Sequence, residues 1–157
     1  MPRTSHRYAL ELTWTGDRGS GTADYRGYSR AHEVTAPGLP PLLGSADPTF
    51  RGEAGRWNPE QLLVAALSQC HLLAYLHVCA VAGVVVTGYV DRPEGVLTRT
   101  SGGGGHFTEV VLRPRVTVAA ADQVDRARDL HSEANRQCFV ANSVNFPVRH
   151  EPVILLP

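Results

Sequence analysis

The chain has 157 residues, of which 43% are hydrophobic and 19% are charged, and its formal net charge at pH 7 is zero. This length and apolar content predict a single domain, residues 1–157, with a sizeable core. The lack of any basic run excludes the charge pattern of a nucleic-acid-binding protein. All fifteen basic residues are arginine, which excludes the Schiff-base and phosphate-loop chemistry that requires lysine.

The cysteine content and the first residues predict a cytoplasmic protein. Three cysteines in 157 residues do not make a disulfide framework, and the first residues lack the apolar stretch of a secretion signal. Cysteines in a reducing compartment are free, bound to metal or redox-active.

The first third of the chain is predicted to hold two strands and a long loop. Residues 7–14 and 25–34 alternate apolar and polar side chains around a turn-forming stretch, which predicts a β-hairpin or a short meander. From Ala36 to Trp57 the chain is rich in proline and glycine without periodicity, so we expect a loop with no regular element. A loop of this length favours a functional role, and it carries Arg51.

A helix is predicted between Asn58 and Gly83, and the other segments are expected to pack around it. Asn58 and Gln61 form a capping box, Pro59 suits the first helical position, and Gly83 ends the helix. Apolar residues occupy almost every face, which predicts a helix buried on all sides. We expect no membrane span, because the apolar run is interrupted by Ser68, Gln69, His71 and His77.

The remaining residues predict further strands and one more helix. Residues 84–90, 95–100 and 106–120 read as strands, with Pro114 at an edge or bulge of the last. Asp122 is a plausible cap for a helix that runs to Cys138. Residues recurring at spacings of three and four place Cys138 on its inward face; they are Val124, Ala127, His131, Ala134 and Cys138. Residues 148–157 read as a final strand.

The two cysteines of the central helix have different surroundings. Cys70 and Cys79 are nine residues apart and therefore lie on opposite faces. Cys79 is flanked by valine and alanine and fits a small apolar filler. Cys70 has polar neighbours, and a buried helix carries polar groups only where they are satisfied or used. Cys70 is therefore the candidate functional thiol.

Two other uses of cysteine and histidine stay open at this point. Zinc binding is weakly supported, because the sequence has no CxxC or HExxH motif and His77 is out of phase with Cys70. A cysteine-dependent hydrolase needs a histidine base, but His71 points away from its neighbour Cys70 on a helix. Of the other histidines only His131, on the stripe of Cys138, has a suggestive position.

Two cysteine-centred motifs carry a family resemblance. NPEQLLVAALSQCH places a glutamate ten residues before a mid-helix cysteine, and QCFVANSVNFPV places a second cysteine at the end of a later helix. Together with SADPTFRGEAGRWNPE they resemble the OsmC/Ohr family of thiol-dependent peroxidases, over a span from about Tyr8 to the end. The resemblance implies an intertwined α+β homodimer with an antiparallel sheet, a long buried central helix, a second helix bearing a cysteine, and no cofactor or metal.

The resemblance also implies a role for each site residue. Cys70 is the peroxidatic cysteine, Cys138 is the resolving cysteine, and Glu60 acts with an arginine to activate Cys70. Arg51 in the TFRGE segment resembles the OsmC-type arginine, whereas the Ohr-type arginine lies nearer the N-terminus, where Arg18 and Arg30 are available. The implied function is the reduction of organic hydroperoxides in oxidative-stress defence, with an external dithiol such as a lipoyl group as reductant.

The chemistry of these residue types agrees with that function. A free thiol with a pKa near 8.5 is mostly protonated at neutral pH, and an adjacent arginine stabilises the thiolate that attacks the O–O bond. A glutamate can hold the guanidinium plane through a bidentate pair. The resulting sulfenic acid condenses with a second thiol to a disulfide, which an external dithiol reduces.

Helix geometry favours a homodimer. Ten helical residues separate Glu60 from Cys70 by about 15 Å along the axis, too far for both to reach one arginine from the same chain. If two central helices pack antiparallel, Glu60 of one chain approaches Cys70 of the other. Two further functions stay open, namely a non-catalytic protein that binds a small hydrophobic ligand on the same fold, and a cysteine-dependent hydrolase.

Overall fold

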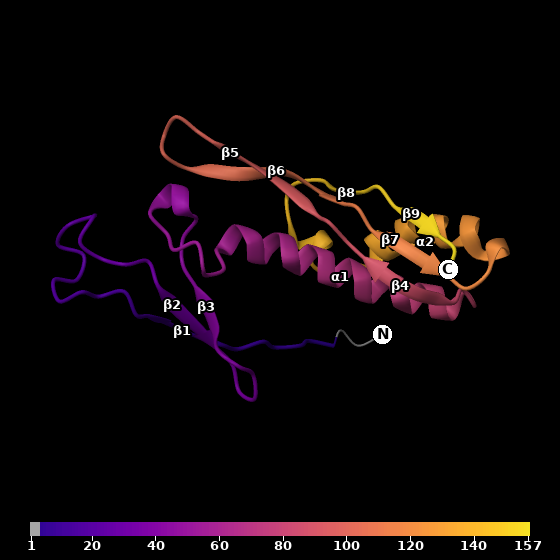
Figure 1. Ribbon diagram of the computed structural model, residues 1–157, viewed down its shortest axis with the longest axis horizontal. Helices are drawn as coiled ribbons and strands as arrows, with labels where there is room; N and C mark the ends of the chain where they lie inside the picture. Colours follow the sequence, from indigo (N-terminus) through magenta and orange to yellow (C-terminus); the bar gives the residue numbers. More distant parts are fainter. Residues whose placement is uncertain (1–3) are drawn as a thin grey trace. The chain divides into compact units, whose positions relative to one another are not determined.

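The computed structural model describes residues 4–157, which form two compact units that divide after Leu62 (Figure 1). The N-terminal unit holds a small sheet and the first turn of the long helix, and the C-terminal unit holds the rest of that helix, two sheets and a second helix. Each unit is described separately below. That residues 1–157 act as one domain stays a prediction.

The N-terminal unit is built on a three-stranded antiparallel sheet in the order β1-β2-β3. Its strands are β1 (Glu11–Trp14), β2 (His32–Thr35) and β3 (Leu42–Gly44). The predicted hairpin is present, with shorter strands and a longer connection. The expectation of no regular element between Ala36 and Trp57 is wrong, because the segment contains β3 and the 3₁₀-helix η1 (Pro48–Phe50). A three-residue strand is too short to show periodicity.

The long helix α1 (Pro59–Val81) is capped as predicted. The Gln61 N–H donates to Asn58 Oδ1 at 2.8 Å and the Asn58 N–H donates to Gln61 Oε1 at 3.2 Å. Gly83 follows the helix with φ of +73°, a left-handed conformation that glycine adopts without strain.

Burial of α1 differs from the expectation. Within one chain only one face is covered, and its buried residues are Leu67, His71, Tyr75, Val78 and Cys79. On other faces Leu73 and Val81 are 67% and 76% exposed. The helix is also long and apolar enough to cross a membrane by length and composition alone, a property that core helices of soluble proteins share.

The C-terminal unit contains two three-stranded mixed sheets. One has the order β4-β7-β9 and the other β5-β6-β8. The strands are β4 (Val86–Val90), β5 (Glu94–Arg99), β6 (Gly105–Leu112), β7 (Arg115–Val118), β8 (Val148–His150) and β9 (Val153–Leu155). The α+β class is as predicted, but β6 pairs with β8 and β7 with β9 in parallel, so the sheets are not purely antiparallel.

Two predicted strands are each divided by a proline. The expected strand 106–120 breaks at Pro114 into β6 and β7, and the expected strand 148–157 breaks at Pro152 into β8 and β9. Proline has no N–H to donate to a sheet, and at both breaks the chain passes from one sheet to the other. The Glu151 N–H donates to the Leu112 carbonyl at 2.8 Å, so the two breaks lie side by side.

The second helix, α2 (Val124–Gln137), follows directly from the 3₁₀-helix η2 (Ala121–Gln123). The prediction that Asp122 caps it is wrong, because Asp122 lies inside η2 and no side chain caps α2. A third 3₁₀-helix, η3 (Ala141–Ser143), comes after it. The predicted inward face is confirmed at Ala127, His131 and Ala134, which are buried together with Leu130.

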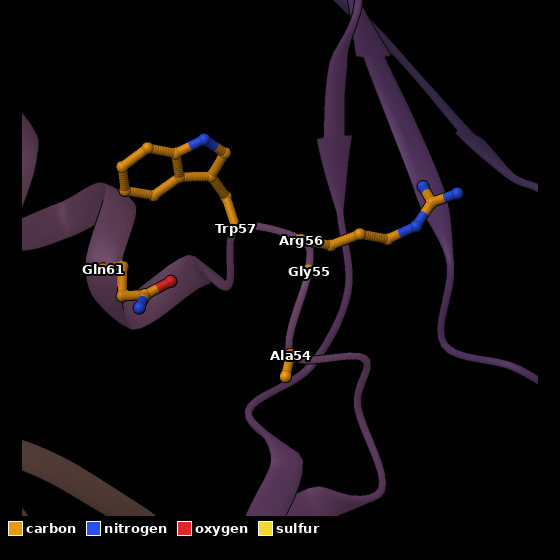
Figure 2. A pocket seen from close by; sticks show the side chains of 5 residues that line it. All are labelled: Ala54, Gly55, Arg56, Trp57 and Gln61. Carbon is orange, nitrogen blue, oxygen red and sulfur yellow. The ribbon is translucent and has the colours of Figure 1, made fainter.

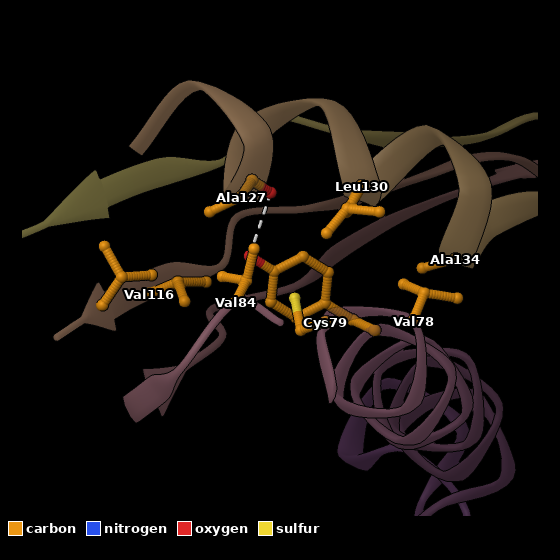
Figure 3. Packing of buried hydrophobic residues seen from close by; sticks show 9 residues of the cluster. Val78, Cys79, Val84, Val116, Ala127, Leu130 and Ala134 are labelled. Atoms are coloured by element: carbon orange, nitrogen blue, oxygen red, sulfur yellow. Dashed lines mark hydrogen bonds between the residues drawn. The ribbon is translucent and has the colours of Figure 1, made fainter. Parts of the chain in front are cut away.

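The main core of the C-terminal unit lies between α1, α2 and the β4-β7-β9 sheet (Figure 3). Its buried members are Tyr75, Val78, Cys79, Val84, Val116, Val118, Ala127, Leu130 and Ala134. The Tyr75 hydroxyl donates to the Ala127 carbonyl at 3.0 Å, the bond drawn as a dashed line in Figure 3. This bond satisfies the one polar atom that Tyr75 brings into the core.

Candidate thiol site

Cys70 and Cys138 are brought together in the C-terminal unit. Cys70 lies in the middle of α1 and is half-buried, whereas Cys138 is 1% exposed and is the residue at which α2 ends. Its backbone turns to an extended conformation, with φ of −71° and ψ of 110°. The Cys138 thiol interacts with the Cys70 thiol. Both thiols are free, so a disulfide between them is chemically accessible.

Burial raises the pKa of the Cys138 thiol above its ordinary value, and the interaction with Cys70 adds to the increase. The Ala141 N–H donates to Cys138 Sγ at 3.4 Å and acts in the opposite direction. The net result is a thiol that stays protonated at neutral pH. Cys138 is therefore a weak nucleophile until a partner sulfur beside it becomes electrophilic.

A hydrophobic cluster contains residues that neighbour the two thiols along the chain. Leu67, three residues before Cys70 on α1, and Val140 and Ala141, just after Cys138, belong to one hydrophobic cluster. The rings of Phe107 and Phe146 lie 5.6 Å apart in the same cluster. Its members are Leu67, Val110, Leu112, Leu63, Val64, Phe107, Val140, Ala141, Val144, Phe146 and Val148.

Cys79 has the environment expected of a filler. It is 1% exposed and packs in the main core with Tyr75 and Val84. Burial raises its pKa, although interactions with Tyr75 and Arg126 act in the opposite direction. That Cys79 takes no part in chemistry stays a prediction.

The three arginines proposed from the sequence line one cavity of the N-terminal unit. Arg18, Arg30 and Arg51, together with Arg26, surround a space of about 360 Å³ whose one carboxylate is Glu53. Arg51 ends η1 with φ of +65°, a conformation that is uncommon outside glycine. Sequence spacing cannot rank these arginines, because folding brings them to the same place.

Arg30 is the most constrained of the three. Its guanidinium carbon lies 4.0 Å from the centre of the Tyr28 ring and 4.5 Å from that of Tyr25. Its Nη1 and Nη2 donate to the carbonyls of Tyr28 and Tyr25, each at 2.7 Å. Arg30 also lines a second cavity, of about 200 Å³, together with Glu60. Arg51 does not line that cavity.

Glu53, which lines the cavity of the four arginines, also forms an ion pair with Arg56. Arg56 Nε lies 3.1 Å from Glu53 Oε2, and the Ser29 hydroxyl donates to Glu53 Oε1. The hydrogen bond from Ser29 and, more weakly, the charge of Arg56 lower the pKa of Glu53. Figure 2 shows a third cavity, of about 260 Å³, in which the Arg56 guanidinium points away from Gln61. Arg56 Nη1 donates instead to the His32 carbonyl at 3.3 Å.

A buried histidine pair links the two helices that carry the cysteines. His71 Nε2 and His131 Nδ1 lie 2.9 Å apart, and the rings are 1% and 0% exposed. Burial lowers the pKa of His71 to about 4 and that of His131 to about 3, with a smaller contribution from neighbouring histidines. Both rings are neutral at pH 7. Sequence reasoning placed His131 on the inward face, but no local pattern predicts a bond to a residue sixty positions away.

Within residues 4–157 there is no group of three or more His, Cys, Asp or Glu side chains that could hold a metal ion. His71 and His131 bond to each other, so neither supplies the free base that the hydrolase alternative needs.

Comparisons with known proteins identify a family and its fold. The family model for OsmC-like proteins matches residues 52–152, well over half of the chain. An OsmC-like protein of unknown function from Vibrio cholerae is 32% identical, with a TM-score of 0.85 over 95% of this chain and 100% of that one. No curated protein matches this sequence.

Two solved structures of organic hydroperoxide resistance proteins share the fold at lower identity. The protein from Elizabethkingia anophelis is 18% identical, with a TM-score of 0.68 over 98% of this chain and 100% of that one. The protein from Legionella pneumophila is 22% identical, with a TM-score of 0.64 over 96% of this chain and 98% of that one.

Proposed function

This chain belongs to the OsmC-like family, and from that premise we propose that it is a cysteine-based peroxidase that reduces organic hydroperoxides in oxidative-stress defence. The observation that carries the proposal is the interaction between the Cys70 and Cys138 thiols beside an apolar cluster. The names of the related proteins from Elizabethkingia anophelis and Legionella pneumophila point to the same class of substrate.

The reaction assigns Cys70 as the peroxidatic residue and Cys138 as the resolving residue. The Cys70 thiolate attacks the terminal oxygen of the hydroperoxide, the O–O bond breaks, and the alkoxide leaves as an alcohol after taking a proton. Cys138 then displaces the hydroxyl of the Cys70 sulfenic acid as water and forms a disulfide. An external dithiol, such as a lipoyl group, reduces that disulfide and completes the cycle.

The two cysteines suit these different roles. Cys70 is half-buried, so a substrate can approach it, whereas Cys138 is sealed from solvent. Because the Cys138 thiol stays protonated, it does not compete for peroxide and reacts only with an electrophilic sulfur next to it. An apolar surrounding favours hydroperoxides with an organic group over hydrogen peroxide, which gains little from burial.

Activation of Cys70 is assigned to Glu60 and an arginine of the cavity described above. Arg51 is the arginine proposed from the sequence motif, and Arg18 and Arg30 are the alternatives. The cavity shared by Arg30 and Glu60 supports Arg30 as a strong competitor. In each case the arginine stabilises the thiolate and the glutamate orients the guanidinium.

A homodimer with intertwined chains is part of the proposal. All four residues of β1 are exposed, with Leu12 at 60% and Trp14 at 41%, and one face of α1 leaves Leu73 uncovered. A second copy that covers these apolar surfaces satisfies the hydrophobic effect. It also lets Glu60 of one chain serve Cys70 of the other. Three cysteines do not make a disulfide framework, which suits a reducing compartment, so we propose a cytoplasmic location.

A peroxide-consumption assay with a dithiol tests the proposal. We expect the wild-type protein and Cys79→Ser to consume cumene hydroperoxide at equal rates and faster than hydrogen peroxide. Cys70→Ser is expected to be inactive, and light scattering should give twice the 17.0 kDa chain mass. If Cys70→Ser consumes peroxide like the wild type, the assignment of Cys70 is wrong. If the wild type consumes no hydroperoxide, the peroxidase assignment is wrong, and a role in binding small hydrophobic ligands becomes the better account.

A further inference from the structure

A buried polar cluster of the C-terminal unit has no part in the reaction proposed above. His71 follows Cys70 directly on α1, and His131 lies seven residues before Cys138 on α2. Their rings are nearly parallel, at 9°, and are joined edge to edge by the 2.9 Å hydrogen bond. The face of His131 also stacks on Tyr75, with ring centres 3.9 Å apart.

The pair is an unfavourable way to fill space. Among residues 4–157 the outer ring nitrogens, His71 Nδ1 and His131 Nε2, have no hydrogen-bond partner. Burial of such polar atoms costs free energy that two apolar side chains of similar volume avoid. What the histidines provide instead is direction, because a hydrogen bond holds only over a narrow range of distance and angle. Apolar contacts tolerate sliding and rotation.

The hydrogen bond crosses between the same two helices as the thiol contact. His131 and Cys138 are seven residues apart, which places them on nearly the same stripe of α2, two turns from each other. On α1 the corresponding residues, His71 and Cys70, are adjacent. The His71–His131 bond and the Cys70–Cys138 contact therefore lie two turns apart along α2. Together they restrict both the axial shift and the rotation of α1 against α2.

We infer that His71 and His131 are positioning residues that hold Cys70 against Cys138 for formation of the disulfide. This inference rests on the proposed function, since it concerns the second step of that reaction. In this step the S–O bond of the Cys70 sulfenic acid breaks, the S–S bond to Cys138 forms, and the Cys138 proton leaves with the hydroxyl as water. Neither histidine touches the reacting atoms in this role.

Other aromatic and histidine rings surround the pair. The groups that face it are Tyr75 from α1 and His150 from β8, whose ring centre lies 5.8 Å from that of His71 and 6.0 Å from that of His131. Tyr89 from β4 lies behind Tyr75. None of these groups is a carboxylate, so the pair stays neutral and its hydrogen bond is intact at the pH of the reaction.

The test measures the equilibrium between the Cys70–Cys138 disulfide and the two thiols in dithiothreitol buffers at pH 7. The variants are His71→Phe and His131→Phe, which keep an aromatic ring and remove the hydrogen bond. The rescue variants are His71→Gln and His131→Asn, whose amides reach the positions of Nε2 and Nδ1. The matched control is His77→Phe, an exposed histidine on the same helix.

We expect each buried Phe variant to shift the equilibrium about tenfold or more toward the thiols. The rescue variants should recover part of that shift, and His77→Phe should match the wild type. A purely structural role lowers the free energy of unfolding without changing this equilibrium in the folded protein, so an unchanged constant in a folded Phe variant overturns the inference. If both Phe variants fail to fold, His131→Gln, whose amide cannot occupy the Nδ1 position, takes their place and carries the same expectation.

Failure of the proposed function is a separate result in the same experiment. Wild-type protein that forms the Cys70–Cys138 disulfide in the redox buffer but consumes no hydroperoxide refutes the peroxidase and leaves the positioning role standing. If the wild-type protein forms no such disulfide at any ratio of oxidised to reduced dithiothreitol, both the peroxidase proposal and the positioning role are refuted.

Discussion

Acidification from pH 7.5 to pH 5 is expected to destabilise this protein through His71 and His131. Each pKa falls on folding, from about 6.5 in an unfolded chain to about 4 for His71 and about 3 for His131. The unfolded chain therefore binds protons below pH 6.5 that the folded chain does not bind, and stability is lost as the pH falls from 6.5 toward 4. Above pH 6.5 both states are deprotonated and this contribution is complete.

The magnitude follows from linkage. At pH 5 an unfolded histidine is almost fully protonated and the folded one is not, so each contributes a loss of about 2 kcal/mol relative to pH 7.5. Two such groups give about 4 kcal/mol, a large share of the 5–15 kcal/mol that stabilises a typical domain. His150, whose pKa is lowered by burial, acts in the same direction.

Urea unfolding at several pH values between 5 and 7.5 measures this loss. The carboxylates whose pKa values are lowered, Asp17, Asp47 and Glu53, affect stability only at lower pH, below their unfolded values near 4. The window from pH 7.5 to 5 is therefore dominated by histidine. His131→Phe should lose about half as much stability as the wild type over this window, and His77→Phe should follow the wild type. A flat free energy of unfolding, or equal slopes in all three proteins, refutes the reasoning.

Four further results are expected. Mass spectrometry of protein treated with one equivalent of organic hydroperoxide should find Cys70 joined to Cys138 and Cys79 as a free thiol. Cys138→Ser should complete one turnover and then accumulate sulfinic acid on Cys70, because no neighbouring thiol traps the sulfenic acid; sustained turnover indicates direct reduction by the external dithiol. Arg51→Ala should slow alkylation of Cys70 at neutral pH and Arg51→Lys should restore part of the rate, whereas a slowing only in Arg30→Ala or Arg18→Ala moves the assignment. Gly52→Ala should lower the free energy of unfolding by about 3 kcal/mol or more, measured in urea, since the added Cβ would clash with the Ala46 carbonyl oxygen.

Elements with local signals were predictable from the sequence. The start of α1 at Pro59 follows from Asn58 and Gln61, whose reciprocal hydrogen bonds form within four residues. Its end follows from Gly83, which the sequence marks as the end of the helix and which adopts a positive φ in the structure. The inward face of α2 follows from helical periodicity.

Elements that depend on distant partners were not predictable. β3 exists because it pairs with β2, and its three residues carry no pattern of their own. Likewise, Pro114 and Pro152 signal an interruption, but the sequence does not tell that the chain changes sheets at both. The parallel pairs β6–β8 and β7–β9 that result join residues about forty positions apart.

The candidate site likewise contains features that the sequence predicts and features that depend on distant partners. The two cysteines were recognised from motifs and lie together in the structure, but the hydrogen bond between His71 and His131 has no local signature. The choice of arginine is the clearest case. The sequence motif favours Arg51 as the OsmC-type arginine and makes Arg30 a candidate only for the Ohr-type position. In the structure, however, both arginines line one cavity.

The guanidinium groups of Arg30 and Arg51 differ in how firmly they are held within the chain. An arginine loses side-chain entropy when it is fixed in one geometry, and this loss is smallest when the guanidinium is already held. Arg30 is held by two tyrosine rings and two carbonyl oxygens before any substrate or partner arrives. Two of its five N–H groups are thereby used, so the remaining donors can still meet a carboxylate and a thiolate. Arg51 lies at a loop position, 6.0 Å from the Tyr25 ring. If Arg51 is the activating arginine, we expect it to depend on Glu60 for its orientation, so Glu60→Gln should slow alkylation of Cys70 more than it would with Arg30 in that role.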